Sequence, residues 1–224
     1  MDQRRASRHD PVLEGDAVSL CSMPRIVIPF AGTEGKTRLH ASPRARHELS
    51  LAMLGDVLAA CAPIGPTTVV TGDADGGALA RDAGADVVDD PGGGQGAAVQ
   101  AALAQLDPGQ LLVVNADVPC VEPGDLRALV ARTPAGAVAL VEALDGTTNA
   151  LVLPEAGAFA PLYGPGSATR FRAHAAEQEL TAVSLAIPNL ADDVDTLEDL
   201  HRLTIRCGPR TRACLAELTV EALQ

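Results

Sequence analysis

The stretch that decides the fold is residues 111–120, which read LLVVNADVPC. Its four leading apolar residues predict a strand buried on both faces, as in a parallel sheet covered by helices. Pro119 cannot donate a hydrogen bond to a neighbouring strand, so the strand is expected to end near Asp117. Ligands of open α/β sheets bind at the carboxyl ends of the strands. Asp117 is therefore predicted to lie at a functional edge of the sheet.

A second acidic group follows at residues 192–195, which read DDVD. Asp193 and Asp195 can share a face, because extended backbone repeats every two residues. A helix is expected to begin at Thr196, and one aspartate is enough to cap it. Three carboxylates in four residues exceed what a cap requires, and like charges this close need a cation or a raised pKa. We interpret Asp117, Asp193 and Asp195 as one magnesium site.

Segments typical of strands and helices alternate along the rest of the chain. The expected strands are residues 25–30, 67–71, 86–89, 137–141, 150–153 and 183–187, and the expected helices are residues 44–61, 74–83, 97–106 and 168–177, with others starting near 122 and 196. This alternation predicts right-handed crossovers and a mostly parallel sheet. The 224 residues suit one such domain, which we expect to span residues 24–224 after a disordered polar extension at 1–23.

Composition narrows the function classes. The net charge of −12 and the isoelectric point near 4.7 argue against nucleic-acid partners, which need a positive surface. The five cysteines have no paired spacing, so neither a zinc site nor a disulfide framework is expected. No apolar run is long enough for a signal peptide or a membrane span. We therefore expect a soluble cytoplasmic protein without membrane or nucleic-acid partners.

Two glycine-containing loops are candidates for binding a nucleotide. Residues 31–39 read AGTEGKTRL, in which glycines allow backbone amides to approach an anion while Lys36 and Arg38 supply positive charge. This is not a Walker A loop, because Phe30 occupies the place of its first glycine. Residues 91–96 read PGGGQG and open a helix, whose first amides can face a base or a phosphate. A basic solvated turn and a flexible connection are the respective alternatives.

Hydroxyl groups mark two further loops. Residues 146–149 read GTTN before an expected strand, and residues 163–167 read YGPGS before an expected helix. Thr148 and Ser167 can each hold a carboxylate or a phosphate. Turn formation and helix N-capping are the more frequent roles of such residues, so both interpretations stay open.

Four motifs in this order resemble the 2-phospho-L-lactate guanylyltransferases: NADVP at 115–119, GTTNAL at 146–151, YGPGS at 163–167 and DVDTLEDL at 193–200. The resemblance runs from about residue 25 to the C-terminus. It implies a Rossmann-like, three-layer α/β nucleotidyltransferase fold of the GT-A-like type, with GTP and Mg²⁺, acting in coenzyme F(420) biosynthesis. In actinobacterial members the acid substrate is phosphoenolpyruvate.

The resemblance also implies residue roles. It assigns metal binding and catalysis to Asp117, Asp193 and Asp195, with Lys36 as a further catalytic residue. It implies that the small phosphorylated acid is bound by Thr148, Gly164 and Ser167. It implies that the nucleotide is bound by Gly32, Gly35, Lys36, Arg38, Gly94 and Gln95. The chain departs from the family at two places. Family members often have a lysine at the position of Ala31, and they often have Leu-Asn at the positions of Gln95 and Gly96.

Other functions remain open. A molybdenum-cofactor or sugar-phosphate nucleotidyltransferase shares the fold, and a non-catalytic nucleotide-binding relative would keep it too. The sequence does not decide among three acids, phosphoenolpyruvate, 2-phospho-L-lactate and 3-phosphoglycerate. They differ by one double bond or one hydroxyl, and the shape of the binding pocket distinguishes such small differences. The labile diphosphate bond of the product predicts that it is handed to a downstream transferase.

Overall fold

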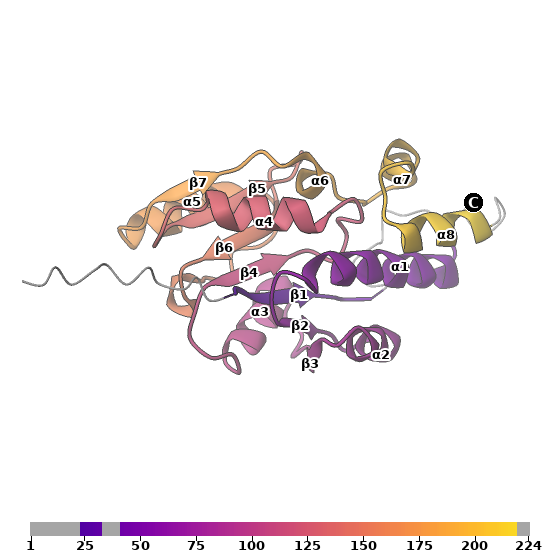
Figure 1. Cartoon of the computed structure of the whole chain (residues 1–224), viewed down its shortest axis with the longest axis horizontal. Helices are drawn as coiled ribbons and strands as arrows, with labels where there is room; N and C mark the ends of the chain where they lie inside the picture. The colour runs from indigo at the N-terminus through magenta and orange to yellow at the C-terminus, as the bar shows by residue number, and fades with distance from the viewer. Residues whose placement is uncertain (1–22, 33–40, 219–224) are drawn as a thin grey trace, which may run out of the picture.

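A seven-stranded sheet forms the centre of the computed structural model, which describes residues 23–32 and 41–218 (Figure 1). Its strands are β1 (Arg25–Pro29), β2 (Thr67–Val70), β3 (Asp86–Val88), β4 (Leu111–Val114), β5 (Val138–Glu142), β6 (Thr148–Leu153) and β7 (Ala182–Ser184). Each lies within one residue of a predicted strand, except that β4 ends at Val114, three residues before the predicted end near Asp117, β6 begins two residues earlier and β7 ends three residues earlier. Residues 1–22 of the predicted extension lie outside the described residues, so the division near residue 23 stays a prediction.

The strand order is β3-β2-β1-β4-β6-β5-β7. All pairings are parallel except those of β6, which runs antiparallel to both β4 and β5. The connection from β5 to β6 is a short turn, too short for the crossover that a parallel pair needs. The prediction of a mostly parallel sheet is thus confirmed, with β6 as the exception.

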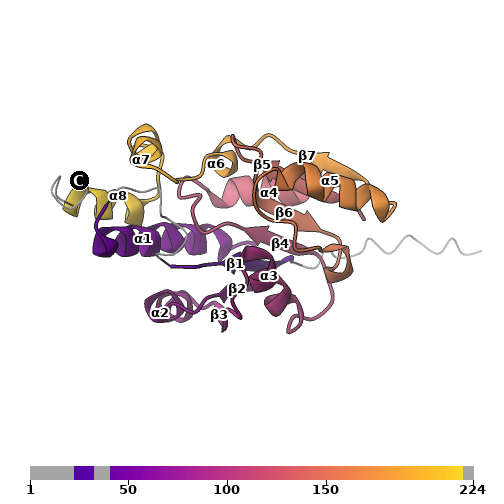
Figure 2. The ribbon, with the colours of Figure 1, turned by 180° about the vertical axis from the view of Figure 1, so that it is seen from behind.

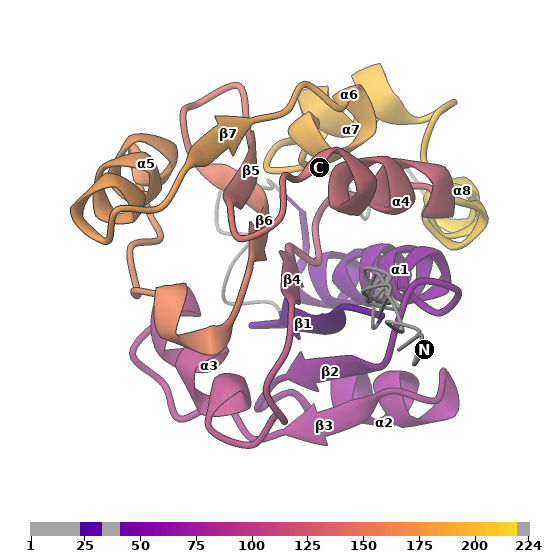
Figure 3. The same ribbon diagram turned by 60° about the vertical axis from the view of Figure 1, so that its left-hand side comes forward.

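Helices cover both faces of the sheet (Figures 2 and 3). Helices α1 (Pro43–Cys61), α2 (Ala74–Asp82), α4 (Pro123–Arg132) and α6 (Pro188–Ala191) pack on one face, and α3 (Gln95–Leu103) and α5 (Ser167–Glu177) pack on the other. Strand β4 shows why its sequence is continuously apolar. Leu112 and Val114 face the first layer, whereas Leu111 and Val113 face the second. The predicted three-layer α/β architecture is confirmed.

Two C-terminal helices, α7 (Leu197–Leu203) and α8 (Pro209–Glu217), pack beside α1 at one end of the molecule (Figure 1). Asp56 of α1, only 5% exposed, accepts hydrogen bonds from the backbone amides of Arg210 and Thr211 at 3.0 and 2.9 Å. These amides belong to the first turn of α8, which has no intrahelical acceptor for them. Asp56 therefore caps α8 from another helix.

Asp56→Ala is expected to lower stability by about 2 kcal/mol, because it leaves two amide donors without an acceptor in a buried place. For a domain of this size the melting temperature should fall by about 4–8 °C. Thermal denaturation measures the change, with Glu48→Ala as control because Glu48 makes an ion pair with exposed Arg44 in the same helix. Equal melting temperatures for the two variants would contradict this role of Asp56.

Among the described residues, no helix combines the length and the apolar character that crossing a bilayer requires.

Candidate active site

The three aspartates singled out in the sequence meet in the structure. Asp117, Asp193 and Asp195 each offer one carboxylate oxygen, and these three oxygens lie within 4.8 Å of one another. All three residues are half-buried, so their charges are partly shielded from water. Oxygen ligands from carboxylates are those that Mg²⁺ prefers. The donor set therefore suits a divalent cation.

Residue 194 holds the acidic segment against the end of β4. The amide of Val194 donates to the carbonyl oxygen of Asp117 at 3.0 Å, and the Val194 side chain is fully buried beside α1 and α7. Because extended backbone alternates its side chains, burying Val194 turns Asp193 and Asp195 to the opposite side. A backbone hydrogen bond and one apolar side chain thus bring two distant acidic segments together.

Asp192, the fourth acidic residue of the region, has a different role. Its carboxylate accepts hydrogen bonds from the guanidinium groups of Arg202 and Arg206, both at 2.7 Å. Burial raises the pKa of Asp192, but these two arginines outweigh it and hold the pKa below the ordinary value. Thr196 caps α7 in a capping box with Asp199, so no aspartate of residues 192–195 is the N-cap. Part of the crowded negative charge is therefore neutralised by two arginines, so the excess of carboxylates is smaller than the sequence of residues 192–195 indicates.

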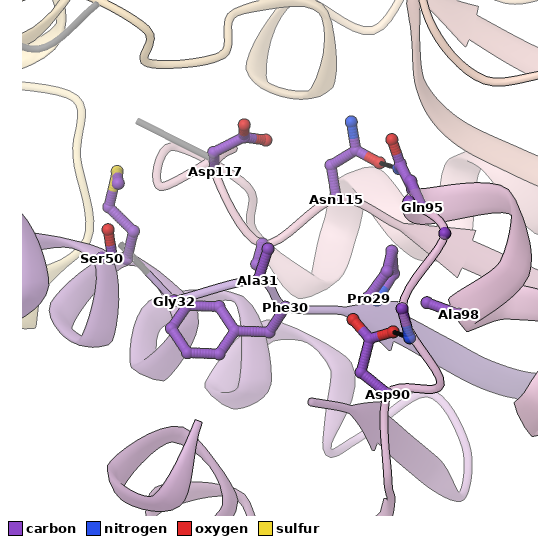
Figure 4. A pocket seen from close by; sticks show the side chains of 15 residues that line it. Pro29, Phe30, Ala31, Gly32, Ser50, Asp90, Gln95, Ala98, Asn115 and Asp117 are labelled. Atoms are coloured by element: carbon purple, nitrogen blue, oxygen red, sulfur yellow. Dashed lines mark hydrogen bonds between the residues drawn. The ribbon is translucent and has the colours of Figure 1, made fainter. Parts of the chain in front are cut away.

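A cavity of about 410 Å³ opens beside Asp117 (Figure 4). It is bounded by the segments that follow β1 and β4, neighbouring strands whose connections leave in opposite directions across the sheet. That is the switch point where open α/β sheets bind ligands. The lining includes Pro29, Phe30, Ala31, Gly32, Ser50, Met53, Asp90, Gly92, Gly93, Gly94, Gln95, Ala98, Asn115, Ala116 and Asp117.

Four of the predicted site residues therefore line one cavity: Gly32, Gly94, Gln95 and Asp117. Gly35, Lys36 and Arg38 lie outside the described residues, so their predicted contacts with the triphosphate stay predictions. Gly32 is the last described residue before them and stands at the cavity.

The glycine loop forms the wall opposite Asp117. Gly92, Gly93 and Gly94 have φ angles of 77°, 87° and 88°, a backbone region that side chains with a Cβ rarely adopt. Helix α3 begins directly afterwards at Gln95, two residues before its predicted start. Backbone amides of a first helical turn have no intrahelical partner, so this wall presents amide donors to the cavity.

A chain of side-chain amides connects the glycine loop to the acidic segment. Gln95 donates to Asn115 Oδ1 at 2.6 Å, and Asn115 Nδ2 donates to Asn149 Oδ1 at 3.2 Å. Asn149, 1% exposed, donates in turn to the carbonyl oxygen of Ala191 at 3.4 Å. Asn115 and Asn149 were not among the predicted site residues, although both stand in the motifs quoted above. The chain links the cavity wall to the backbone that precedes the aspartates.

Gly96, next to Gln95, is required for packing. A Cβ atom there would lie 2.6 Å from Pro161 Cβ and 2.9 Å from Pro161 Cα. Gly96→Ala should therefore lower stability by about 1–3 kcal/mol, since the backbone of one segment must shift. Thermal denaturation measures this loss of stability. Gly124→Ala is the control, because no atom lies within 4 Å of the corresponding Cβ position. A stability loss no larger than that of the control would contradict the packing role.

The predicted acid-binding residues form a second group. Ser167 Oγ donates to Thr148 Oγ1 at 3.1 Å, and the two residues are 0% and 1% exposed. Gly164 accepts from the Ser167 amide at 2.9 Å. Ser167 is the first residue of α5, whereas Gly166 takes the N-cap position, so the N-cap interpretation of Ser167 is wrong. These three residues lie together, but they are outside the lining of the cavity beside Asp117.

Arg170 shapes the loop that contains Gly164. Its guanidinium group donates to the carbonyl oxygens of Leu162, Tyr163 and Pro165 at distances of 2.7–3.2 Å. A planar group with five donors suits several carbonyls at once. Arg170 was not predicted, because such contacts with backbone oxygens leave no motif in the sequence.

Comparison with known proteins settles the family. A family model described as "Guanylyl transferase CofC like" matches residues 24–221. The chain belongs to this family. It is 36% identical over 202 residues to the phosphoenolpyruvate guanylyltransferase of Nocardia farcinica, covering 83% of this chain and 87% of the relative. It is 37% identical over 166 residues to that of Roseiflexus castenholzii, covering 73% and 78%.

Solved structures support the fold of this chain. A nucleotidyl transferase from Methanothermobacter thermautotrophicus superposes with a TM-score of 0.62 at 19% identity, covering 88% of this chain and 99% of the other. At this identity the likeness concerns the fold alone. The predicted nucleotidyltransferase fold and the resemblance stated from four motifs are both confirmed, and the chain is a member of an enzyme family.

Proposed function

We propose that this chain transfers GMP from GTP to phosphoenolpyruvate and releases pyrophosphate, as a step in coenzyme F(420) biosynthesis. The observation that carries the proposal is the three-aspartate group beside a nucleotide-sized cavity at the switch point of the sheet. The relatives support the choice of substrates, because the two named above are phosphoenolpyruvate guanylyltransferases. A cytoplasmic location and hand-off of the product to a further transferase stay predictions.

The reaction requires little acid–base chemistry from the protein. An oxygen of the acid's phosphate forms a bond to the α-phosphorus of GTP, while the bond from that phosphorus to the bridging oxygen of the β-phosphate breaks. Pyrophosphate carries away the electron pair. A phosphomonoester with a second pKa near 6 is mostly dianionic at pH 7, so its oxygen attacks without a general base. The main task of the site is to bring two polyanions into line.

The acidic group performs the electrostatic part of this task. Asp117, Asp193 and Asp195 would hold magnesium, whose charge offsets phosphate repulsion and stabilises the leaving pyrophosphate. The donor set fits such an ion, since three carboxylate oxygens converge within 4.8 Å. Asn149 and the Val194 amide keep the acidic segment beside β4, so the carboxylates are positioned before the substrates arrive.

The nucleotide occupies the cavity from Asp117 to the glycine loop. Gly32 begins the loop that continues to Gly35, Lys36 and Arg38, and we assign the triphosphate to this side. Gly94 and Gln95 stand at the other side, where we assign the guanosine. Asn115 accepts from Gln95 Nε2 and so fixes the direction of this amide.

The acid binds beside the start of β6 and α5. Thr148, Gly164 and Ser167 are assigned to its phosphate and carboxylate. Helix α5 points its N-terminus to this place, and the helix dipole favours a negative group there. Because β6 is antiparallel to β4, its first residues lie at the same edge as Asp117.

The test is pyrophosphate release from purified full-length protein with GTP and magnesium. Phosphoenolpyruvate, 2-phospho-L-lactate and 3-phosphoglycerate are supplied separately, and mass spectrometry follows the guanosine product. We expect release with phosphoenolpyruvate, and none with ATP or with a chelator. Release with only one of the other two acids would identify that acid as the substrate in place of phosphoenolpyruvate. GTP binding without release in any acid would instead support a non-catalytic relative.

A further inference from the structure

The nucleotide cavity is lined by a further carboxylate, Asp90, which is not one of the three aspartates of the candidate metal site. Asp90 follows β3 and lines the cavity with the glycine loop and Gln95. It is half-buried, and its Oδ1 accepts a hydrogen bond from the Gly92 amide at 2.8 Å. In Figure 4, Asp90 and Asp117 stand on opposite sides of the cavity, with Ala31 and Phe30 between them.

The two carboxylates are too far apart to share an ion. Strands β3 and β4 are separated in the sheet by β2 and β1, so three strand spacings of about 4.8 Å each lie between the segments that follow them. Asp117 marks the phosphate end of the cavity. Asp90 therefore stands at the end where the base of a nucleotide would lie.

The chemistry of Asp90 suits a particular base. An ionised carboxylate only accepts hydrogen bonds, and it repels phosphate. Guanine presents two adjacent donors, N1–H and the 2-amino group, on one edge. Adenine presents a donor beside an acceptor there, so one of its atoms would face the carboxylate unfavourably. Hydrogen bonds from neutral donors to an ionised carboxylate are also stronger than neutral pairs.

The surrounding backbone leaves room for a flat ring. No atom lies within 4 Å of the position that a Cβ would take at Gly92 or Gly94, so the loop surface is bare backbone. The Gly92 amide fixes one oxygen of Asp90, and thereby the orientation of the carboxylate. A base lying against this loop would place one edge toward Asp90.

We propose that Asp90 selects guanine, by accepting hydrogen bonds from N1–H and the 2-amino group of the base. This inference rests on the proposed use of GTP, and it adds a specificity-determining residue to the same site. Gln95, whose amide is directed by its hydrogen bond to Asn115, lines the same cavity.

Asp90→Asn tests the assignment with GTP, ITP, XTP and ATP. The asparagine keeps an oxygen for the Gly92 amide but places an NH₂ donor where guanine has its own amino donor. Xanthine has a carbonyl at that position and pairs with the new donor. We expect kcat/KM for GTP to fall at least about tenfold, and the ratio of XTP to GTP to rise about 100-fold or more. The wild type should discriminate against ITP, which lacks the 2-amino group, and the variant should lose this discrimination.

Asp89→Asn is the matched control, because Asp89 is an exposed neighbour outside the cavity lining and the charge change is the same. Displacement of a fluorescent GTP analogue by the four nucleotides measures selectivity without any acid substrate. Failure of the wild type to release pyrophosphate would refute the proposed function, whereas unchanged displacement selectivity in Asp90→Asn would refute this inference. A uniform loss for all four nucleotides, with a lower melting temperature, would also overturn it, since Asp90 would then only form the turn.

Discussion

Asp117→Asn is expected to lower kcat by about 10³-fold while leaving the fold intact. The substitution keeps the shape of the side chain but removes one of three converging negative charges. The loss corresponds to about 4 kcal/mol of transition-state stabilisation, in the range of what metal-ion catalysis supplies. Backbone contacts should persist, because the bond from the Val194 amide goes to the carbonyl oxygen of residue 117 and not to its side chain.

The metal assignment also has a readout that does not depend on turnover. An ion that binds only the folded state raises the melting temperature by mass action. Millimolar magnesium should therefore stabilise the wild type, and Asp117→Asn should lose most of this shift. Asp107→Asn is the control, since Asp107 pairs with Arg25 at the opposite edge of the sheet. Near-normal turnover in Asp117→Asn, with an unchanged magnesium shift, would refute the assignment.

The sequence predicted the parts of this site that depend on local pattern. The apolar run before Asp117 indicated a buried strand, and the alternation around Val194 placed Asp193 and Asp195 on one side. Both conclusions follow from the twofold repeat of extended backbone and from the burial of apolar residues. Site residues adjacent to such patterns could therefore be named without a structure.

Tertiary contacts explain what could not be predicted. Asp192 adds to the acidic excess of residues 192–195, yet Arg202 and Arg206, ten and fourteen residues later, neutralise it. Asn149 donates a hydrogen bond to the carbonyl oxygen of Ala191, 42 positions later in the chain, and Asp56 caps a helix that lies 154 positions later. The periodicity of the sequence does not indicate such partners, because they come into contact only when separate helices and strands pack together.

The buried pair of hydroxyls at the proposed acid site permits a sharper experiment. Ser167 and Thr148 hydrogen-bond to each other and are almost fully buried, so their present contact is also explained by packing alone. If they hold the acid, Ser167→Ala should raise KM for phosphoenolpyruvate by about tenfold or more, because each hydrogen bond to a charged group contributes about 1.5–3 kcal/mol. KM for GTP should stay nearly unchanged.

A double-mutant cycle separates binding from packing. Ser167→Ala alone leaves the Thr148 hydroxyl buried without its partner, which costs stability, whereas adding Thr148→Val removes the orphaned group and should restore part of the melting temperature. A role in acid binding predicts no such recovery for KM, because the double variant lacks both hydroxyls and should bind the acid no better than either single variant. From the single to the double variant, stability would then recover, whereas KM for the acid would stay high or rise further. If KM for the acid instead stays at the wild-type value in the double variant, the two hydroxyls serve packing only, and the acid must be held by the backbone amides at the start of α5.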